Sequence, residues 1–383
     1  MDSEQLIGFG LVLLGAICGG SFGLPSKFAK EDTPWEVLWG PFFFFATILI
    51  PTIVAPFVVN DLGAIYAAVG TETIISVLIF GFLWGLGSMT LGMSFSFIGL
   101  SLAYSLNYGA QIVTGSMGPM LIFHRDAITT AEGSLEQHTW VILAGVATCV
   151  LGVIIAGRAG ILKDRSLQGD TATTEETAGA GGQPKMLIGV IIGIASGVLC
   201  ACYAIASEYA GPIGAEAGAE VAENVFRNPP WAAAWAVTAM ILWGGAVSSC
   251  LYCVVQLTKN KTWGHLTKKG IGLTLLLAAA MAVLHDGAIF LFGLGWISMG
   301  GMLGIAVGYP VFMSFAIIVG NFHGFRTGEW KGASRQSIQW IIAGIGVLII
   351  GVCVLAAGKT MQEKKAAADK KSQEQPAAAA AES

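Results

Sequence analysis

Four polar side chains, Tyr104, Asn107, Tyr108 and Gln111, recur every three or four residues within an otherwise apolar stretch. On a helix, this spacing places them along one face. Hydrocarbon penalises such groups unless they face protein or a water-filled cavity, and an amide can both donate and accept hydrogen bonds. We expect the stripe to line a cavity for a polar solute; the alternative is hydrogen bonding between packed helices.

A carboxylate, Asp286, lies near the middle of the apolar run MAVLHDGAIFLF. A charged side chain at this depth costs about 2.5–3.5 kcal/mol on insertion scales. We therefore expect Asp286 to bind a proton on one side of a membrane and release it on the other, unless it serves as a structural hydrogen-bonding group. His285 points about 100° away on an ideal helix and need not share the cavity. It is nevertheless a candidate relay, as is Glu208 near the end of another apolar segment.

Two aromatic residues, Trp84 and Tyr309, are further candidates for the solute site, although aromatic side chains in membrane helices often serve packing instead. We find no nucleotide-binding loop, metal-ligand cluster or catalytic triad, so we expect no cofactor, no metal and no enzyme activity. The seven cysteines all lie in apolar segments, which is typical of small buried residues.

The composition indicates the elements that must position these side chains. Apolar residues make up 55% of the chain, charged residues only 11%, and the mean hydropathy is +0.71, which argues against a soluble globular fold. A hydrocarbon core needs about 20 apolar residues per helix. The sequence predicts an all-α membrane protein with ten such helices, at about 5–24, 36–58, 74–98, 101–123, 139–157, 186–208, 231–257, 271–295, 299–321 and 338–357.

The third and fourth segments are joined only by Ile98-Gly99-Leu100-Ser101, which predicts a tight helical hairpin inside the bilayer. The second segment contains Pro41, Pro51 and Pro56, and we expect it to be kinked.

The two halves of the chain share glycine spacings: Gly92 matches Gly293 and Gly99 matches Gly300 at one offset, which also pairs Tyr108 with Tyr309. Five helices per half is an odd number, so two similar halves would lie inverted in the membrane, as in many secondary transporters. The predicted organisation is a first five-helix repeat (1–163), a flexible linker (164–185), a second repeat (186–358) and a disordered tail (359–383).

Basic loop residues predict the orientation, because Lys and Arg concentrate on the cytoplasmic side. Placing both termini outside leaves only Arg125 and Arg227 in outside loops. The inside loops then hold Lys27, Lys30, Arg158, Lys163, Arg165, Lys185, Lys259, Lys261, Lys268, Lys269, Arg326, Lys331 and Arg335.

With these segments in place, the chain resembles the L-rhamnose/proton symporter family of the drug/metabolite transporter superfamily over about residues 8–357. The most specific stretches are FGFLWGLGSMTLGMSFSFIGLSLAYSLNYGAQIVTGSMGPM, LGVIIAGRAGILKDR, YAGPIGAEAGAE and FRTGEWKGAS. The resemblance implies ten helices, a bacterial-type inner-membrane location and cation-coupled uptake of a methylpentose.

We therefore expect a secondary active transporter that imports a monosaccharide, L-rhamnose or a related sugar, with proton coupling by alternating access. Its partners would be the sugar, protons and the lipid bilayer, with no nucleic acid. The alternatives are an exporter or exchanger of another small metabolite on the same fold, or a membrane enzyme or sensor. Membrane enzymes and sensors usually carry long catalytic loops or a soluble effector domain, and these are absent here.

Overall fold

The computed structural model describes residues 3–123, 128–129, 134–169, 182–223, 225–299 and 308–381. Within these ranges, the side chains of 168–169, 182–185, 296, 309–310 and 369–381 are not described. Almost all of the described chain is helical. The one sheet within the described ranges is a short antiparallel pair, β1 (Glu220–Ala222) with β2 (Val225–Phe226), in the loop predicted to lie outside.

Eight of the described helices or helix groups are long and apolar enough to cross a membrane, which confirms an all-α polytopic membrane protein. The long helices, with their shorter companions, run in the order α1 (Ser3–Ser21), η1 (Leu24–Phe28), α2 (Trp35–Phe44), η2 (Phe45–Leu49), α3 (Ile50–Val58), α4 (Leu62–Ala68), α5 (Thr71–Phe123), α6 (Gln137–Gly169), α7 (Gly182–Cys200), α8 (Cys202–Tyr209), α9 (Gly211–Ala217), α10 (Pro230–Lys259), η4 (Trp263–Thr267), α11 (Ile271–Met299), α13 (Tyr309–Arg326) and α14 (Arg335–Ala381).

The predicted hairpin corresponds to α5, whose two arms meet at Gly99. Gly99 has φ 78° and ψ 171°, a conformation that is essentially restricted to glycine. Residues 101–110 of the second arm are all buried, so protein surrounds this part of the helix on every side. The break therefore turns the chain within the molecule and places the second arm at its centre.

Two other predicted segments are interrupted. The second segment consists of α2 and α3 joined by the π-helical turn η2, which lies between Pro41 and Pro51. Proline removes a backbone donor and disturbs the preceding turn, which explains an irregular helix here. The sixth segment is divided at Ala201 into α7 and α8.

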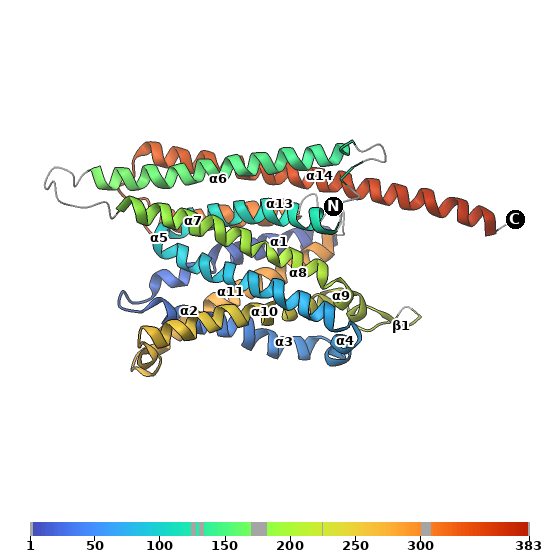
Figure 1. Ribbon diagram of the computed structural model, residues 1–383, viewed down its shortest axis with the longest axis horizontal. Coiled ribbons are helices and arrows are strands. Elements are labelled where there is room, and N and C mark those ends of the chain that lie inside the picture. Colours follow the sequence, from blue (N-terminus) through green and yellow to red (C-terminus); the bar gives the residue numbers. More distant parts are fainter. Residues whose placement is uncertain are drawn as a thin grey trace.

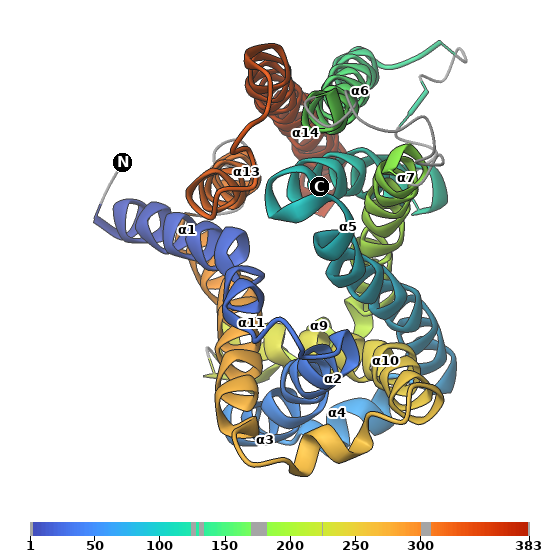
Figure 2. The same cartoon turned by 90° about the vertical axis from the view of Figure 1, so that its left-hand side faces the viewer.

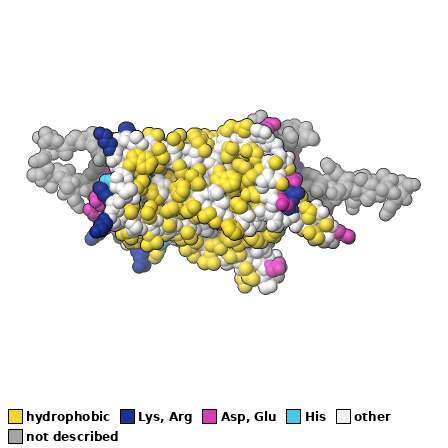
Figure 3. All heavy atoms as spheres, turned by 90° about the horizontal axis from the view of Figure 1, so that it is seen from below, with side chains coloured by type: hydrophobic (Ala, Val, Ile, Leu, Met, Phe, Trp, Pro, Cys, Tyr) yellow, Lys and Arg dark blue, Asp and Glu magenta, His cyan; other side chains and the backbone are white. Residues whose placement is uncertain are grey.

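The helices form a ring of antiparallel rods (Figures 1 and 2). The pair α6 and α14 packs along one side, α7 packs on α5, and α1 packs on α11 and α13. On the opposite side, α10 packs against α5 and α2. Figure 3 shows a broad apolar band on the surface between two ends with charged groups, as expected for a protein embedded in lipid.

The predicted linker and tail are only partly described. Helix α6 continues to Gly169 and α7 begins at Gly182, while 170–181 lie outside the described residues. Helix α14 runs on into the predicted tail as far as Ala381. The predicted ninth segment is described from Gly308 onward, where α13 follows.

Candidate substrate-binding site

A cavity of about 310 Å³ lies between α1, both arms of α5, α7, α8, α11, α13 and α14. It is mainly apolar, with a few polar groups aimed into it, as is typical of small-molecule sites. Its polar lining residues are Ser88, Asn107, Tyr108, Gln111, Cys200, Tyr203, His285 and Lys359. Elements from both halves of the chain therefore form one site.

The predicted polar stripe on α5 contributes three of its four members to this lining. Asn107 donates to Ser196 Oγ of α7 at 2.8 Å, while its Oδ1 atom is buried without a partner among the described residues. Tyr108 donates to the Gly19 carbonyl at 3.0 Å. Gln111 lies between buried and exposed and has no bonding partner within the described chain. Its amide is therefore the member of the stripe most available to a solute.

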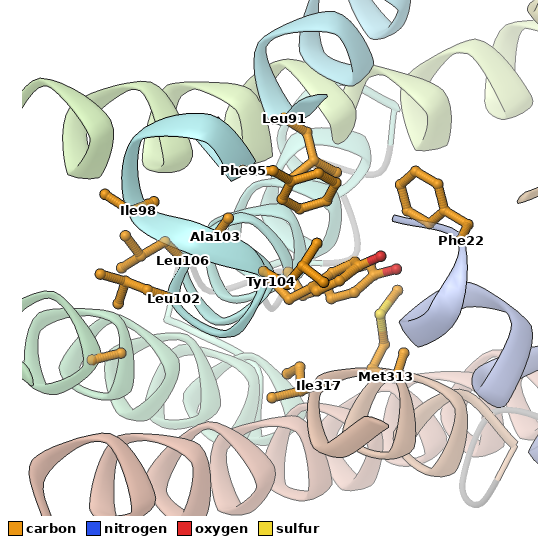
Figure 4. Close-up of a cluster of buried hydrophobic side chains, with 14 of the residues drawn as sticks. Phe22, Leu91, Phe95, Ile98, Leu102, Ala103, Tyr104, Leu106, Met313 and Ile317 are labelled. Atoms are coloured by element: carbon orange, nitrogen blue, oxygen red, sulfur yellow. The ribbon is translucent and has the colours of Figure 1, made fainter. Parts of the chain in front are cut away.

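Tyr104 lies outside the lining, in the core behind it. Its hydroxyl accepts a hydrogen bond from the Gly23 N–H at 2.9 Å, and its ring stacks on Tyr108 with the centroids 5.6 Å apart. In Figure 4, its ring lies close to those of Phe22 and Phe95. These contacts join α1 to α5, which is a packing role.

Trp84 and Ser88 line the cavity from the first arm of α5. They are four residues apart, so they share a face of the helix. The Trp84 ring lies 5.8 Å from the Tyr203 ring and 5.9 Å from the His285 ring, measured between centroids. This side of the cavity therefore offers an aromatic surface with a hydroxyl next to it.

His285 lines the cavity, whereas Asp286 lies behind it, 4% exposed. The two are joined by a bond of 2.7 Å between His285 Nδ1 and Asp286 Oδ1. Asp286 Oδ2 is buried without a partner among the described residues. Phe22, Phe42 and Trp84 surround the imidazole ring. The histidine thus stands between the carboxylate and the cavity, and its Nε2 atom is the polar group it can offer to a solute.

Glu208 is not brought to this lining. It lies exposed near the end of α8, within electrostatic reach of Lys359. Tyr309 begins α13, but its side chain lies outside the described residues.

The polar lining residues that the sequence analysis missed include Ser88, Tyr203 and Lys359. Ser88 could have been predicted from the sequence, because it lies one helical turn after Trp84 and so shares its face of the helix. Tyr203 follows the break at Ala201, which the sequence does not reveal. Lys359 fell in the segment assigned to the tail, and only the continuation of α14 places it at the cavity.

The described residues hold no group of three or more His, Cys, Asp and Glu side chains that could bind a metal ion. Both titratable residues at the centre of the site, His285 and Asp286, belong to a single pair. The arrangement can bind a small polar molecule and can exchange a proton between a carboxylate and an imidazole.

Comparison with known proteins now identifies the family. The family described as L-rhamnose-proton symport protein (RhaT) matches residues 1–361. The chain belongs to this family. It is therefore a membrane transport protein and not an enzyme.

Curated relatives agree over almost the full chain. L-rhamnose-proton symporters of Citrobacter koseri and Pectobacterium atrosepticum are 25% and 26% identical to it, and each alignment covers 94% of this chain and 99% of the relative. The L-rhamnose-proton symporter of Escherichia coli strain 55989 is 24% identical, with the same coverage. No solved structure matches the chain.

Proposed function

We propose that this RhaT-family protein imports a monosaccharide, L-rhamnose or a related sugar, together with protons, and that it works by alternating access. The observation that carries this proposal is the cavity that both the unpartnered Gln111 amide and His285 face, with Asp286 bonded to His285 from behind. The names of the relatives support both the sugar and the proton.

The lining suits a sugar in size and chemistry. A volume of about 310 Å³ is at the lower end of the range for small-molecule sites. The Trp84 ring offers an apolar face on which a sugar ring can lie, while Gln111 and Ser88 offer hydrogen bonds to hydroxyl groups. Because the Gln111 amide would pair only with the sugar, it would favour a sugar over less hydroxylated molecules.

The proton would bind at the His285–Asp286 pair. The same imidazole would bind a sugar hydroxyl through Nε2 and contact the proton-binding carboxylate through Nδ1. Binding of the sugar can therefore change the affinity for the proton, and the reverse. Asp286 holds the imidazole in place and has a second oxygen, Oδ2, to accept a proton. Sugar and proton could therefore cross the membrane together without direct contact between them.

The fold would comprise ten spans in two inverted repeats. Counting the two arms of α5 separately and adding α13 to the candidate spans gives ten crossings. Packing between the halves is reciprocal: α7 packs on α5, as α1 packs on α11 and α13. Likewise, α10 packs on α5 as α2 packs on α11, and the last helices, α6 and α14, pack on each other. Such an exchange of contacts is expected when two repeats rock around a shared site.

The structure corresponds to an outward-facing state in this proposal. Lining residues run from the middle of the helices to Lys359 on α14, near the end that we assign to the outside. Toward the opposite end, Phe22, which is itself part of the lining, packs with Phe95 and Tyr104 (Figure 4). This aromatic cluster would separate the site from the cytoplasm.

Uptake by purified protein in liposomes tests the proposal. With an inward proton gradient, labelled L-rhamnose or a related monosaccharide should accumulate above its external concentration, and collapse of the gradient should abolish accumulation. Liposomes without protein are the control. If none of a panel of methylpentoses and other monosaccharides accumulates, the importer proposal is wrong. Accumulation that instead requires an outward gradient would favour the exporter.

A further inference from the structure

Glu329 is a buried carboxylate outside the cavity lining, and the proposed transport site does not use it. It lies in the turn after α13, and its side chain is 8% exposed. Met313 of α13 lines the cavity, and the helix continues for about 20 Å beyond it before ending at Arg326, at about 1.5 Å per residue. Glu329 is thus at the end of the molecule that we assign to the cytoplasm.

The carboxylate joins two other elements at that end. Its Oε1 atom accepts from the Leu100 N–H at 2.7 Å, and its Oε2 atom accepts from the Ser101 N–H at 3.1 Å. These are the first donors of the second arm of α5, after the break at Gly99. A helix start carries unpaired N–H groups and a partial positive charge, so a carboxylate is well suited to it.

Lys27 of η1, which follows α1, completes the arrangement. Its ammonium lies 2.8 Å from Glu329 Oε1, and its side chain is 30% exposed. One carboxylate therefore connects the end of α13, the hairpin break of α5 and the segment after α1. We call these three groups, Glu329, Lys27 and the Leu100–Ser101 backbone, the inner clasp.

Further contacts show how closely these elements meet. Asn321 of α13 bonds to both Ser101 and Ser105 of α5. A Cβ atom added at Gly324 would lie 2.5 Å from Ser101 Cβ and 2.7 Å from Glu329 Oε2. Ser21 of α1 bonds to His323 of α13 at 2.9 Å. Helices from both halves are therefore in contact around the clasp.

We propose that Glu329 is a positioning residue that holds the inner end of the transporter closed while the cavity faces outside. The inference rests on the proposed transport function, because alternating access requires α1, α5 and α13 to separate at this end. On separation, water can solvate the Glu329 carboxylate, the Lys27 ammonium and the two N–H groups. The net cost of breaking such bonds is then modest, which suits a contact that must open in every cycle.

The test measures access to the cavity from each side. A cysteine replaces Gly115, a lining residue at which an added Cβ atom makes only ordinary van der Waals contacts, in a protein whose native lining cysteine, Cys200, is changed to Ala. A membrane-impermeant thiol reagent is then applied to right-side-out and inside-out vesicles. The same protein without the Gly115 substitution gives the background from the remaining native cysteines.

Glu329→Gln should increase the labelling rate from the inner side by about tenfold, because the amide lacks the charge and turns one acceptor into a donor facing an N–H. Lys27→Gln should increase it by about twofold to fivefold, because it removes a partly exposed ion pair. Lys27→Arg, which retains the pair, should restore the low rate. Labelling from the outer side should fall only by the share of molecules that leave the outward-facing state, because a large relative rise of a minor state removes little from the major one.

Glu31→Gln and Lys30→Gln are matched controls, because both side chains are exposed at the same end. They should label like the unmodified protein. If Glu329→Gln and Lys27→Gln label like these controls from both sides, the clasp does not gate the cavity. Should Glu329→Gln fail to reach the membrane, Lys27→Gln alone decides.

The labelling needs no sugar. If the variants change the labelling from each side but the protein takes up no sugar, the gating role of Glu329 holds and the proposed substrate is wrong. If sugar uptake is normal and the labelling is unchanged, the transport proposal holds and the gating role is wrong.

Discussion

At the scale of single residues, Gln111 and Asn107 make different predictions although both line the cavity. Gln111 has no partner in the described chain, so its amide is free to bind a solute. Gln111→Ala should weaken sugar binding by about 1–3 kcal/mol, roughly tenfold to a hundredfold, and leave folding intact. Binding to purified protein and its melting temperature in detergent measure the two effects.

Asn107 provides the comparison. Its side chain bonds to Ser196 between α5 and α7, so Asn107→Ala should lower the melting temperature as well as weaken binding. Unchanged binding in both variants, with normal folding, would make the stripe purely structural.

Asp286 makes a prediction about coupling. Asp286→Asn keeps the size of the side chain and a possible bond to His285 but removes the site that titrates. Gradient-driven accumulation should be lost, while sugar binding survives with a flatter pH dependence, since the amide resembles the protonated acid. Uptake into liposomes, with and without a proton gradient, checks this. Concentration of sugar against its gradient by this variant would place the coupling site elsewhere, with His285 and Glu208 tested next.

Sequence reasoning identified half of the polar lining residues, Asn107, Tyr108, Gln111 and His285, but not their arrangement. Helical spacing correctly grouped Asn107, Tyr108 and Gln111, because that spacing depends only on local geometry. It could not show that Tyr104 turns into the core, since this depends on the approach of Gly23, which lies between α1 and η1. Nor could it show that His285 rather than Asp286 reaches the cavity, which depends on how α11 is rotated among its neighbours.

At the scale of elements, the hairpin break predicts sensitivity at Gly99. A Cβ atom there would lie 2.6 Å from Glu329 Oε2, and the backbone conformation itself costs about 1–3 kcal/mol for other residues. Gly99→Ala should therefore destabilise the protein by at least that amount, seen as a lower melting temperature in detergent. Gly287→Ala, on α11 with nothing near the added atom, is the control and should have little effect. Equal melting temperatures for both variants would contradict a strained break.

The element boundaries show what local sequence can and cannot predict. The sequence placed the hairpin turn at Ile98-Gly99-Leu100-Ser101, because only these few residues separate two apolar runs of membrane length. The break in the structure is at Gly99, within this turn. Prolines likewise marked the irregular second segment. The division at Ala201 has no proline at the break and went unpredicted. It lies where lining residues from α7 and α8 face the cavity, so tertiary packing determines it.

At the scale of the whole molecule, charge is unevenly distributed between the two ends. In Figure 3, most of the visible Lys and Arg side chains gather at one end of the apolar band. That end contains the turns after α1, α10 and α13, which are the loops predicted to lie inside. The other end contains α9, β1 and β2. The asymmetry that the sequence indicated is therefore also present in three dimensions.

This asymmetry predicts that both termini lie outside the cytoplasm, because basic loops are retained on the cytoplasmic side. Cysteines introduced at Glu223 and Lys269 test it. Both positions are exposed, and Glu223 directly follows β1, whereas Lys269 lies in the turn between α10 and α11. A site in α9 such as Ala217 is unsuitable because the structure buries it. In intact cells, a membrane-impermeant thiol reagent should label Glu223→Cys and spare Lys269→Cys, and permeabilisation should expose the second site. The parent protein sets the background. Labelling in the opposite pattern would invert the topology, and the cavity would then face the cytoplasm.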